Sequence, residues 1–210
     1  KVMIQRDGGR AIGLTNEMYQ KAGAEIVDSA EDIFRRAEMI IKVKEPQPVE
    51  CAMLREGQVL YTYLHLAPDP DQTAALVKSG CTAIAYETVT DRKGGLPLLA
   101  PMSEVAGRMS IQAGAHALEK AQGGSGVLLG GVPGVKPAEV MVIGGGVVGI
   151  NAARMAMGMN AHVTILDRSL DRLKYLDELY GHQLTTIYST HDAIEERLPD
   201  TDLVIGAVLI

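Results

Sequence analysis

The stretch VMVIGGGVVGINAARMAMGMNAHVTILD, residues 140–167, decides the fold of this chain. Two apolar runs with branched residues predict short buried strands over residues 140–143 and 162–166. The segment between them, residues 147–159, is predicted to be a helix, and a glycine-rich turn joins it to the first strand. Strand, turn, helix and strand in this order form a βαβ unit, the building block of a parallel sheet.

The turn holds three glycines, Gly144, Gly146 and Gly149, in the pattern G-x-G-x-x-G. In a dinucleotide-binding unit the first turns the chain, the second lets the backbone approach a pyrophosphate, and the third lets helix and strand pack closely. Asp167 ends the second strand, where a carboxylate can accept hydrogen bonds from an adenosine ribose. An acid there favours NAD because it repels a 2′-phosphate, while the neighbouring Arg168 leaves NADP open. A glycine-rich turn without a ligand is the alternative, but the flanking strands and the acid favour a Rossmann-type unit.

The alternation of strands and helices continues after this unit. Further strands are predicted over residues 185–188 and 203–207, each preceded by a helix. The order β-α-β-α-β-α-β predicts a doubly wound parallel sheet with spatial order 3-2-1-4, in which the fourth strand lies beside the first. The end of the fourth strand, residues 206–209, would then border the cofactor crevice. We expect the remaining strands of such a sheet downstream of Ile210.

The first part of the chain has a different organisation. Residues 1–97 alternate strand-like runs with helical or turn segments, which predicts part of a second α/β domain. Residues 98–210 hold a linking helix, predicted over residues 103–120, and the nucleotide-binding domain. Glycines 107 and 114 share one face of that helix, where a neighbouring element can approach closely. The predicted strands of the first part cover residues 2–5, 39–43, 59–63 and 82–86.

Composition excludes several classes of protein. The 210 residues are 47% hydrophobic and 22% charged, as in soluble globular domains. A net charge of −6 without a basic run argues against nucleic acid as a partner. The terminal run LVIGAVLI is too short to span a bilayer and no signal-peptide pattern opens the chain, so we expect no membrane contact and a cytoplasmic location. Because the chain opens at Lys1 without methionine and stops in or just after a strand, we expect it to be part of a longer polypeptide.

Two side chains after predicted strands are candidates for chemistry. His65, in YTYLHLAPDP, titrates near neutrality and can move the proton that accompanies hydride loss from carbon. Lys44, in IIKVKEP, carries an ammonium that can hold a substrate carboxylate. Each also has an ordinary interpretation, a structural histidine and a solvated lysine. No Ser-His-Asp pattern, paired-carboxylate signature or metal motif is evident.

Several motifs together make the sequence recognisable: IIKVKEP, TYLHLAPDP, AIAYETV, LPLLAPMSEVAGRM, GVLLGGVPGV, IGGGVVG with ILD, and DLVIGAVLI. They resemble the alanine dehydrogenase family over nearly the whole chain. The resemblance implies an oxidoreductase of L-alanine catabolism that deaminates L-alanine reversibly to pyruvate and ammonia. It also implies NAD as the cofactor, no metal, and a homohexamer.

The resemblance implies roles for individual residues as well. His65 would be the acid/base or substrate-polarising group, and Lys44 would hold the substrate oxygens. Arg172 stands where the family usually has a lysine near the ribose, so its contact with the cofactor stays open. The family places a substrate-binding arginine upstream of Lys1 and a catalytic aspartate downstream of Ile210, so these 210 residues alone are expected to be inactive. With the pattern glycines Gly144 and Gly149, the residues expected at the cofactor are Met102, Ser103, Gly146, Val147, Val148, Asp167, Ser189, Val208 and Leu209.

Two alternatives remain beside the dehydrogenase. One is the nucleotide-binding component of a proton-translocating NAD(P) transhydrogenase, which needs a membrane partner, and the other is a nucleotide-binding regulatory or assembly module without catalysis. His65 in LHLAP and Lys44 in KVKEP follow the dehydrogenase pattern. Alanine-dependent NADH formation, hydride exchange between nucleotides, and binding without either reaction would distinguish the three.

Overall fold

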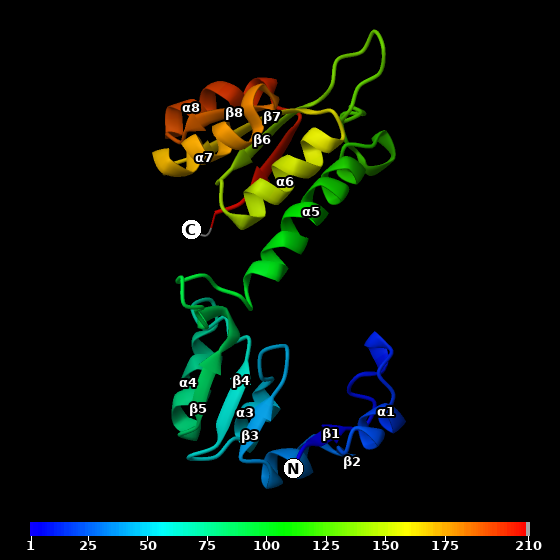
Figure 1. Ribbon diagram of the computed structural model, residues 1–210, viewed down its shortest axis with the longest axis vertical. Helices are drawn as coiled ribbons and strands as arrows, with labels where there is room; N and C mark the ends of the chain where they lie inside the picture. Colours follow the sequence, from blue (N-terminus) through cyan, green and yellow to red (C-terminus); the bar gives the residue numbers. More distant parts are fainter. Residues whose placement is uncertain (209–210) are drawn as a thin grey trace. The chain divides into compact units, whose positions relative to one another are not determined.

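The computed structural model describes residues 1–208, and the chain divides into two compact units, Lys1–Leu99 and Ala100–Ile210 (Figure 1). Both units are built from parallel strands that alternate with helices. The predicted α/β class, with a doubly wound parallel sheet, is therefore confirmed. Each unit has its own buried apolar cluster and is described by itself.

The N-terminal unit contains two small parallel sheets. One pairs β1 with β2, and the other has the order β3-β4-β5. Strands β1, β3, β4 and β5 confirm the four predicted ones to within two residues at each end, whereas β2 was not predicted. The elements are β1 (Met3–Gln5), η1 (Arg10–Ile12), α1 (Asn16–Lys21), β2 (Glu25–Val27), α2 (Ala30–Arg36), β3 (Met39–Ile41), α3 (Pro48–Met53), β4 (Val59–Thr62), α4 (Pro70–Ser79), β5 (Thr82–Ala85) and η2 (Tyr86–Thr88).

Prolines and polar caps set the helix starts around the larger sheet. Helices α3 and α4 both begin with a proline, whose missing N–H is not needed in a first turn. The Asp69 side chain caps α4 by accepting a hydrogen bond from the backbone nitrogen of Gln72 at 2.9 Å. Because β3, β4 and β5 are parallel, their carboxyl ends meet at one edge of the sheet, and the loops after them lie together. The core below this edge contains Phe34, Ile40, Cys51, Leu54, Leu60, Leu64 and Leu76.

The C-terminal unit is a four-stranded parallel sheet with the order β8-β7-β6-β9. This confirms the predicted order 3-2-1-4, with the last strand beside the first. Three consecutive residues of β6 and three of the six residues of β7 are buried, as in parallel strands covered on both faces. The elements are α5 (Ala100–Ala117), η3 (Lys120–Gln122), β6 (Glu139–Ile143), α6 (Val147–Gly158), β7 (His162–Asp167), α7 (Leu170–Tyr180), η4 (Gly181–Gln183), β8 (Leu184–Tyr188), α8 (His191–Arg197), η5 (Leu198–Asp200) and β9 (Leu203–Gly206).

Helix α5 packs along α6 within this unit (Figure 1). It begins before its predicted start, because Pro101 fits a first helical turn. A Cβ on Gly107 would lie 2.2 Å from the carbonyl oxygen of Val148, and one on Gly114 would lie 2.6 Å from Leu203 Cδ2. Both glycines are buried, so the predicted close approach on one face is confirmed. Among residues 1–208, no helix has the length and apolar character needed to cross a membrane.

Candidate functional site

The glycine turn lies between β6 and α6, and each of its pattern glycines has a distinct geometric requirement. Gly144 has φ of +104°, and a Cβ there would lie 2.8 Å from the carbonyl oxygen of Ala207. A Cβ on Gly149 would lie 1.8 Å from the Gly144 oxygen, so no other residue permits this approach of helix to turn. Gly146 is exposed and a Cβ there would meet no atom within 4 Å, which leaves its backbone accessible at the start of α6. The turn therefore fits a pyrophosphate placed at a helix N-terminus.

Asp167 and Arg172 both bind the backbone of Gly145, which lies between Gly144 and Gly146. Asp167 Oδ2 accepts a hydrogen bond from the Gly145 backbone nitrogen at 2.6 Å, and its Oδ1 accepts one from Ser169 at 2.7 Å. The Arg172 Nε donates to the Gly145 carbonyl oxygen, and its guanidinium carbon lies 5.0 Å from the centre of the Tyr175 ring. A carboxylate has about four lone-pair sites, so Asp167 can still accept from ribose hydroxyls.

Other residues expected at the cofactor lie along the carboxyl edge of the same sheet. The Ser189 nitrogen donates to the Asp167 carbonyl oxygen at 2.9 Å, and Val208 Cγ1 would lie 2.6 Å from a Cβ on Gly144. Val147 and Val148 form the first turn of α6. Met102 and Ser103 lie in the first turn of α5, one turn before the glycine that approaches Val148. Leu209 lies outside the described residues.

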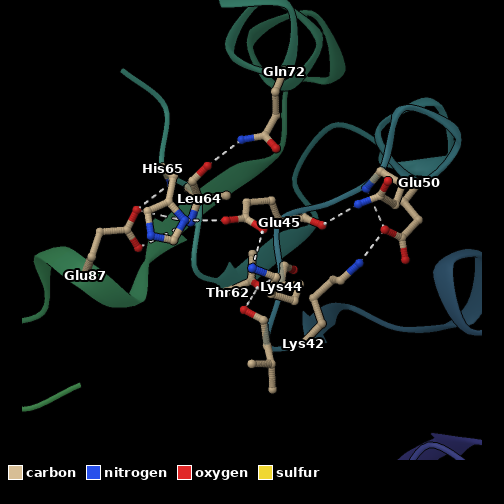
Figure 2. A network of polar contacts seen from close by, with 11 residues as sticks. Lys42, Lys44, Glu45, Glu50, Thr62, Leu64, His65, Gln72 and Glu87 are labelled. Atoms are coloured by element: carbon tan, nitrogen blue, oxygen red, sulfur yellow. Dashed lines mark hydrogen bonds and ion pairs between the residues drawn. The ribbon is translucent and has the colours of Figure 1, made fainter. Parts of the chain in front are cut away.

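In the N-terminal unit, Lys44 lies in the loop after β3, two residues further from the strand than predicted because β3 ends at Ile41 (Figure 2). Its side chain is 80% exposed, and its Nζ is 3.7 Å from Glu45 Oε2. The buried Thr62 fixes the loop from β4, because its hydroxyl oxygen lies 2.8 Å from the Lys44 carbonyl oxygen. The loop backbone is thus held while the ammonium faces solvent.

The backbone of His65 has an unusual conformation just beyond β4. Its φ is +46°, in the left-handed region, which costs a residue other than glycine on the order of 1–3 kcal/mol. Glu87 Oε1 accepts hydrogen bonds from the backbone nitrogens of His65 at 2.7 Å and Leu64 at 3.1 Å. The carbonyl oxygen of Leu64 accepts from the Gln72 side chain at 2.6 Å. Two buried or partly buried side chains therefore stabilise this bend.

The imidazole of His65 is constrained as well. Its Nδ1 is hydrogen-bonded to Glu45 Oε1 (Figure 2). One face stacks near the Tyr63 ring, with ring centres 6.0 Å apart and planes inclined by 16°. The Tyr63 hydroxyl donates to the carbonyl oxygen of Leu98, which anchors the stacking ring. The His65 side chain remains 43% exposed, so a ligand can reach it.

Both carboxyl groups beside His65 favour the ionised form. Burial is the largest influence on Glu87 and acts to raise its pKa, but the backbone N–H groups of His65, Glu87 itself and Leu64 together lower that pKa below its usual value. The pKa of Glu45 is lowered mainly by its own backbone N–H, against burial, with further contributions from His65 and Lys44. At neutral pH both groups are therefore hydrogen-bond acceptors only.

Neither Glu45 nor Glu87 was predicted as a functional residue. A signal for Glu87 existed, because it follows a predicted strand whose carboxyl end lies at the same edge as those before Lys44 and His65. The hydrogen bond from the His65 backbone nitrogen to Glu87, 22 positions away, could not be predicted from the sequence pattern. Within residues 1–208 no three His, Cys, Asp or Glu side chains are grouped to hold a metal ion.

A parallel sheet that carries a glycine turn and an acid at its carboxyl edge defines the class of α/β dinucleotide-binding proteins. Residues 1–106 match the family "Alanine dehydrogenase/PNT, N-terminal domain", and residues 110–210 match "Alanine dehydrogenase/PNT, C-terminal domain". The chain belongs to this alanine dehydrogenase/PNT family.

Similar proteins agree with this membership. The chain is 56% identical over 209 residues to an alanine dehydrogenase of Halomonas elongata and 52% identical over 210 residues to that of Bacillus subtilis. Both matches extend over 100% of this chain but over only 56% and 55% of the two relatives. The chain therefore spans about half the length of the curated relatives it matches. A solved L-alanine dehydrogenase superposes with a TM-score of 0.88 at 50% identity, over 100% of this chain and 58% of that one. A transhydrogenase from Sinorhizobium meliloti shares the fold. It superposes with a TM-score of 0.78 at 23% identity, over 100% of this chain and 61% of that one.

Proposed function

We propose that the protein containing this chain is an NAD-dependent L-alanine dehydrogenase. It converts L-alanine, NAD⁺ and water reversibly into pyruvate, ammonium, NADH and a proton. The observation that carries the proposal is His65, held in a left-handed conformation by Glu87 with its ring directed by Glu45, beside Lys44 at one sheet edge. The two alanine dehydrogenases that are 56% and 52% identical to the chain support the choice of substrate.

In this function His65 transfers protons and Lys44 binds the substrate carboxylate. The Lys44 ammonium is exposed and attracts the substrate carboxylate, which positions the amine-bearing carbon. Oxidation of that carbon requires the substrate ammonium to lose a proton, and the imine that results must then add water. The Nε2 atom of His65 accepts the ammonium proton and releases it to solvent. It then accepts a proton from the attacking water and returns it to the amine nitrogen, after which the C–N bond breaks and ammonia leaves with the remaining hydroxyl proton as ammonium. The same transfers run backwards in the reverse reaction.

NAD is the cofactor of the proposed reaction, and when bound it supplies the hydride acceptor. Gly146 and the first turn of α6 would hold the pyrophosphate, because that backbone is accessible and a helix begins there. Asp167 would accept from the adenosine ribose and Arg172 would support the turn through Gly145. The other residues proposed at the cofactor are Met102, Ser103, Gly144, Val147, Val148, Gly149, Ser189, Val208 and Leu209.

Four further features are proposed from the resemblance to the family. Residues 1–97 are proposed to belong to a substrate domain, and residues 98–210 to the linking helix and nucleotide-binding domain. The intact protein is proposed to be a cytoplasmic homohexamer, which sedimentation of the purified full-length protein would test. Residues 1–210 alone are proposed to be inactive, because the relatives they match are nearly twice as long.

The test compares two histidine variants of the full-length protein. His65→Ala should lower the turnover number for L-alanine about 100-fold or more, as loss of a proton-transfer group does, with NAD affinity unchanged. His162→Ala is the matched control, because that imidazole pairs with Glu139 at the start of β7, the opposite end from Asp167. NADH formation is followed by absorbance. Turnover of the His65 variant near that of the control would reject the assignment, and hydride exchange between nucleotides without alanine turnover would favour a transhydrogenase.

A further inference from the structure

We propose that Glu45 is a positioning residue that fixes both the tautomer and the direction of the His65 imidazole. Its carboxylate accepts the Nδ1 proton and so leaves Nε2 as the nitrogen that exchanges protons with the substrate. This inference rests on the proposed function, in which His65 transfers protons. Figure 2 shows Glu45 between the two side chains that the function uses. Its Oε1 atom is hydrogen-bonded to His65 Nδ1, and its Oε2 atom lies 3.7 Å from Lys44 Nζ.

The tautomer follows from the chemistry of the contact. An ionised carboxylate has no hydrogen to donate, so the Nδ1 atom of His65 must carry the proton of the hydrogen bond. The Glu45 side chain is 24% exposed and its pKa lies below the usual value, which keeps it ionised at neutral pH. A free histidine side chain favours the opposite tautomer, with the proton on Nε2. The ring nitrogen that bears the proton is therefore set by its hydrogen-bond partner.

The direction of the ring follows from three contacts that act on different parts of His65. Glu87 holds the backbone nitrogen, Tyr63 lies against a ring face, and Glu45 holds Nδ1. A flip of the ring would break the hydrogen bond at Nδ1, so these contacts favour one orientation of the imidazole. The Nε2 atom lies on the other side of the ring and has no hydrogen-bond partner within residues 1–208, so it is free to meet a substrate.

The sequence around Glu45 explains why this residue can position the His65 imidazole. Pro46 follows it, and a residue before proline is restricted to an extended backbone. Thr62 Oγ1 lies 2.8 Å from the carbonyl oxygen of Lys44, which anchors the peptide unit that leads into Glu45. The backbone of Glu45 is thus restrained independently of the imidazole with which its carboxylate pairs.

The test measures the tautomer and the rate in the full-length enzyme. Solid-state ¹⁵N NMR of protein labelled only at histidine distinguishes a protonated ring nitrogen from a bare one, and His65→Asn identifies the His65 signals by their loss. In the wild type we expect His65 as the Nδ1–H tautomer. In Glu45→Ala we expect the Nε2–H tautomer and a turnover number lower by about 10- to 100-fold, with the KM values for pyruvate and NADH little changed. Glu45→Gln keeps an acceptor oxygen and should lie between the two in both measurements.

Glu50→Gln is the matched control, because Glu50 pairs with Lys42 and caps α3 on the same segment of chain. A glutamine at that position can keep the cap, so we expect wild-type turnover and an unchanged His65 signal. If Glu45→Gln and Glu45→Ala keep the Nδ1–H tautomer, or lose it with no change in turnover, the inference is wrong while the proposed function stands. If His65→Ala itself turns over normally, the proposed function fails whatever the tautomer. Circular dichroism of each variant shows whether a lost rate reflects a lost fold, and Glu45→Gln then decides.

Discussion

Glu87 Oε1 lies 2.7 Å from the backbone nitrogen of His65 and contacts the chain of that residue rather than its ring. The carboxylate therefore stabilises a bend with φ of +46° that would otherwise relax. The imidazole can occupy its place at the sheet edge only while this bend is kept.

Glu87→Gln should lower the stability of the protein by about 1–3 kcal/mol at neutral pH, because charge-assisted hydrogen bonds to two backbone nitrogens are weakened. The pKa of Glu87 is lowered in the folded state, so its contribution is complete above the unfolded value of about 4.3 and is lost as the pH falls through the folded pKa. Urea unfolding of both proteins at neutral and acidic pH should show a gap that shrinks in acid. Glu38→Gln, at an exposed carboxylate of the same unit, should show little effect at either pH, and an equal gap at both pH values for Glu87→Gln would contradict the assignment.

Lys44→Ala and Lys42→Ala should have different effects although the residues are two positions apart. The Lys44 side chain is 80% exposed and accessible to substrate although its Nζ lies 3.7 Å from Glu45 Oε2, so its loss should raise the KM for pyruvate about tenfold or more. Lys42 pairs with Glu50, and these side chains are only 22% and 19% exposed, so its loss should lower stability instead. Steady-state kinetics and thermal unfolding separate the two effects. Equal KM changes would remove Lys44 from substrate binding.

Asp167→Asn should reduce the preference for NAD over NADP, measured as the ratio of kcat/KM values. The amide keeps an oxygen for the Gly145 nitrogen but removes the charge that repels a 2′-phosphate, so we expect a shift of about tenfold toward NADP. Asp171→Asn makes the same chemical change on the exposed face of α7 and serves as control. An unchanged ratio in Asp167→Asn would show that this carboxylate does not face the ribose.

Two glycines of α6 should respond in opposite ways to alanine. Gly149→Ala would place a Cβ 1.8 Å from the Gly144 carbonyl oxygen, and we expect a loss of about 1–3 kcal/mol or more as turn and helix move apart. Gly158→Ala meets no atom within 4 Å and should stabilise the protein by about 0.4–1 kcal/mol. The urea concentrations at the unfolding midpoints of the two variants, compared with that of the unsubstituted protein, measure both changes in stability. A Gly149→Ala midpoint as high as that of the unsubstituted protein would show that the approach of helix to turn does not require glycine.

The C-terminal unit was predictable because its determinants are local. The apolar runs that became β6 and β7, and the glycines at 144 and 149, obey short-range geometric rules that can be read in the sequence. Strand β2 is as short as β1 and β3, but its apolar run is only Ile26 and Val27, whereas β3 lies in the longer run MIIKV, so no strand pattern emerges at β2. The surroundings of His65 depend on contacts to residues 20 and 22 positions away, and nothing in the local pattern foretells them.

Gly145 is held at its N–H by Asp167 and at its carbonyl by Arg172, which means that the turn is preorganised by folding. Its conformational entropy is lost when the protein folds and does not have to be lost again when a nucleotide arrives. The rates at which a nucleotide binds and leaves should therefore reflect diffusion and direct contacts rather than closure of a loop. In the proposed function the same arrangement would connect the two ends of the nucleotide site, because a shift of the Asp167 carboxylate toward a ribose would move the Gly145 N–H and with it the turn proposed to hold the phosphates.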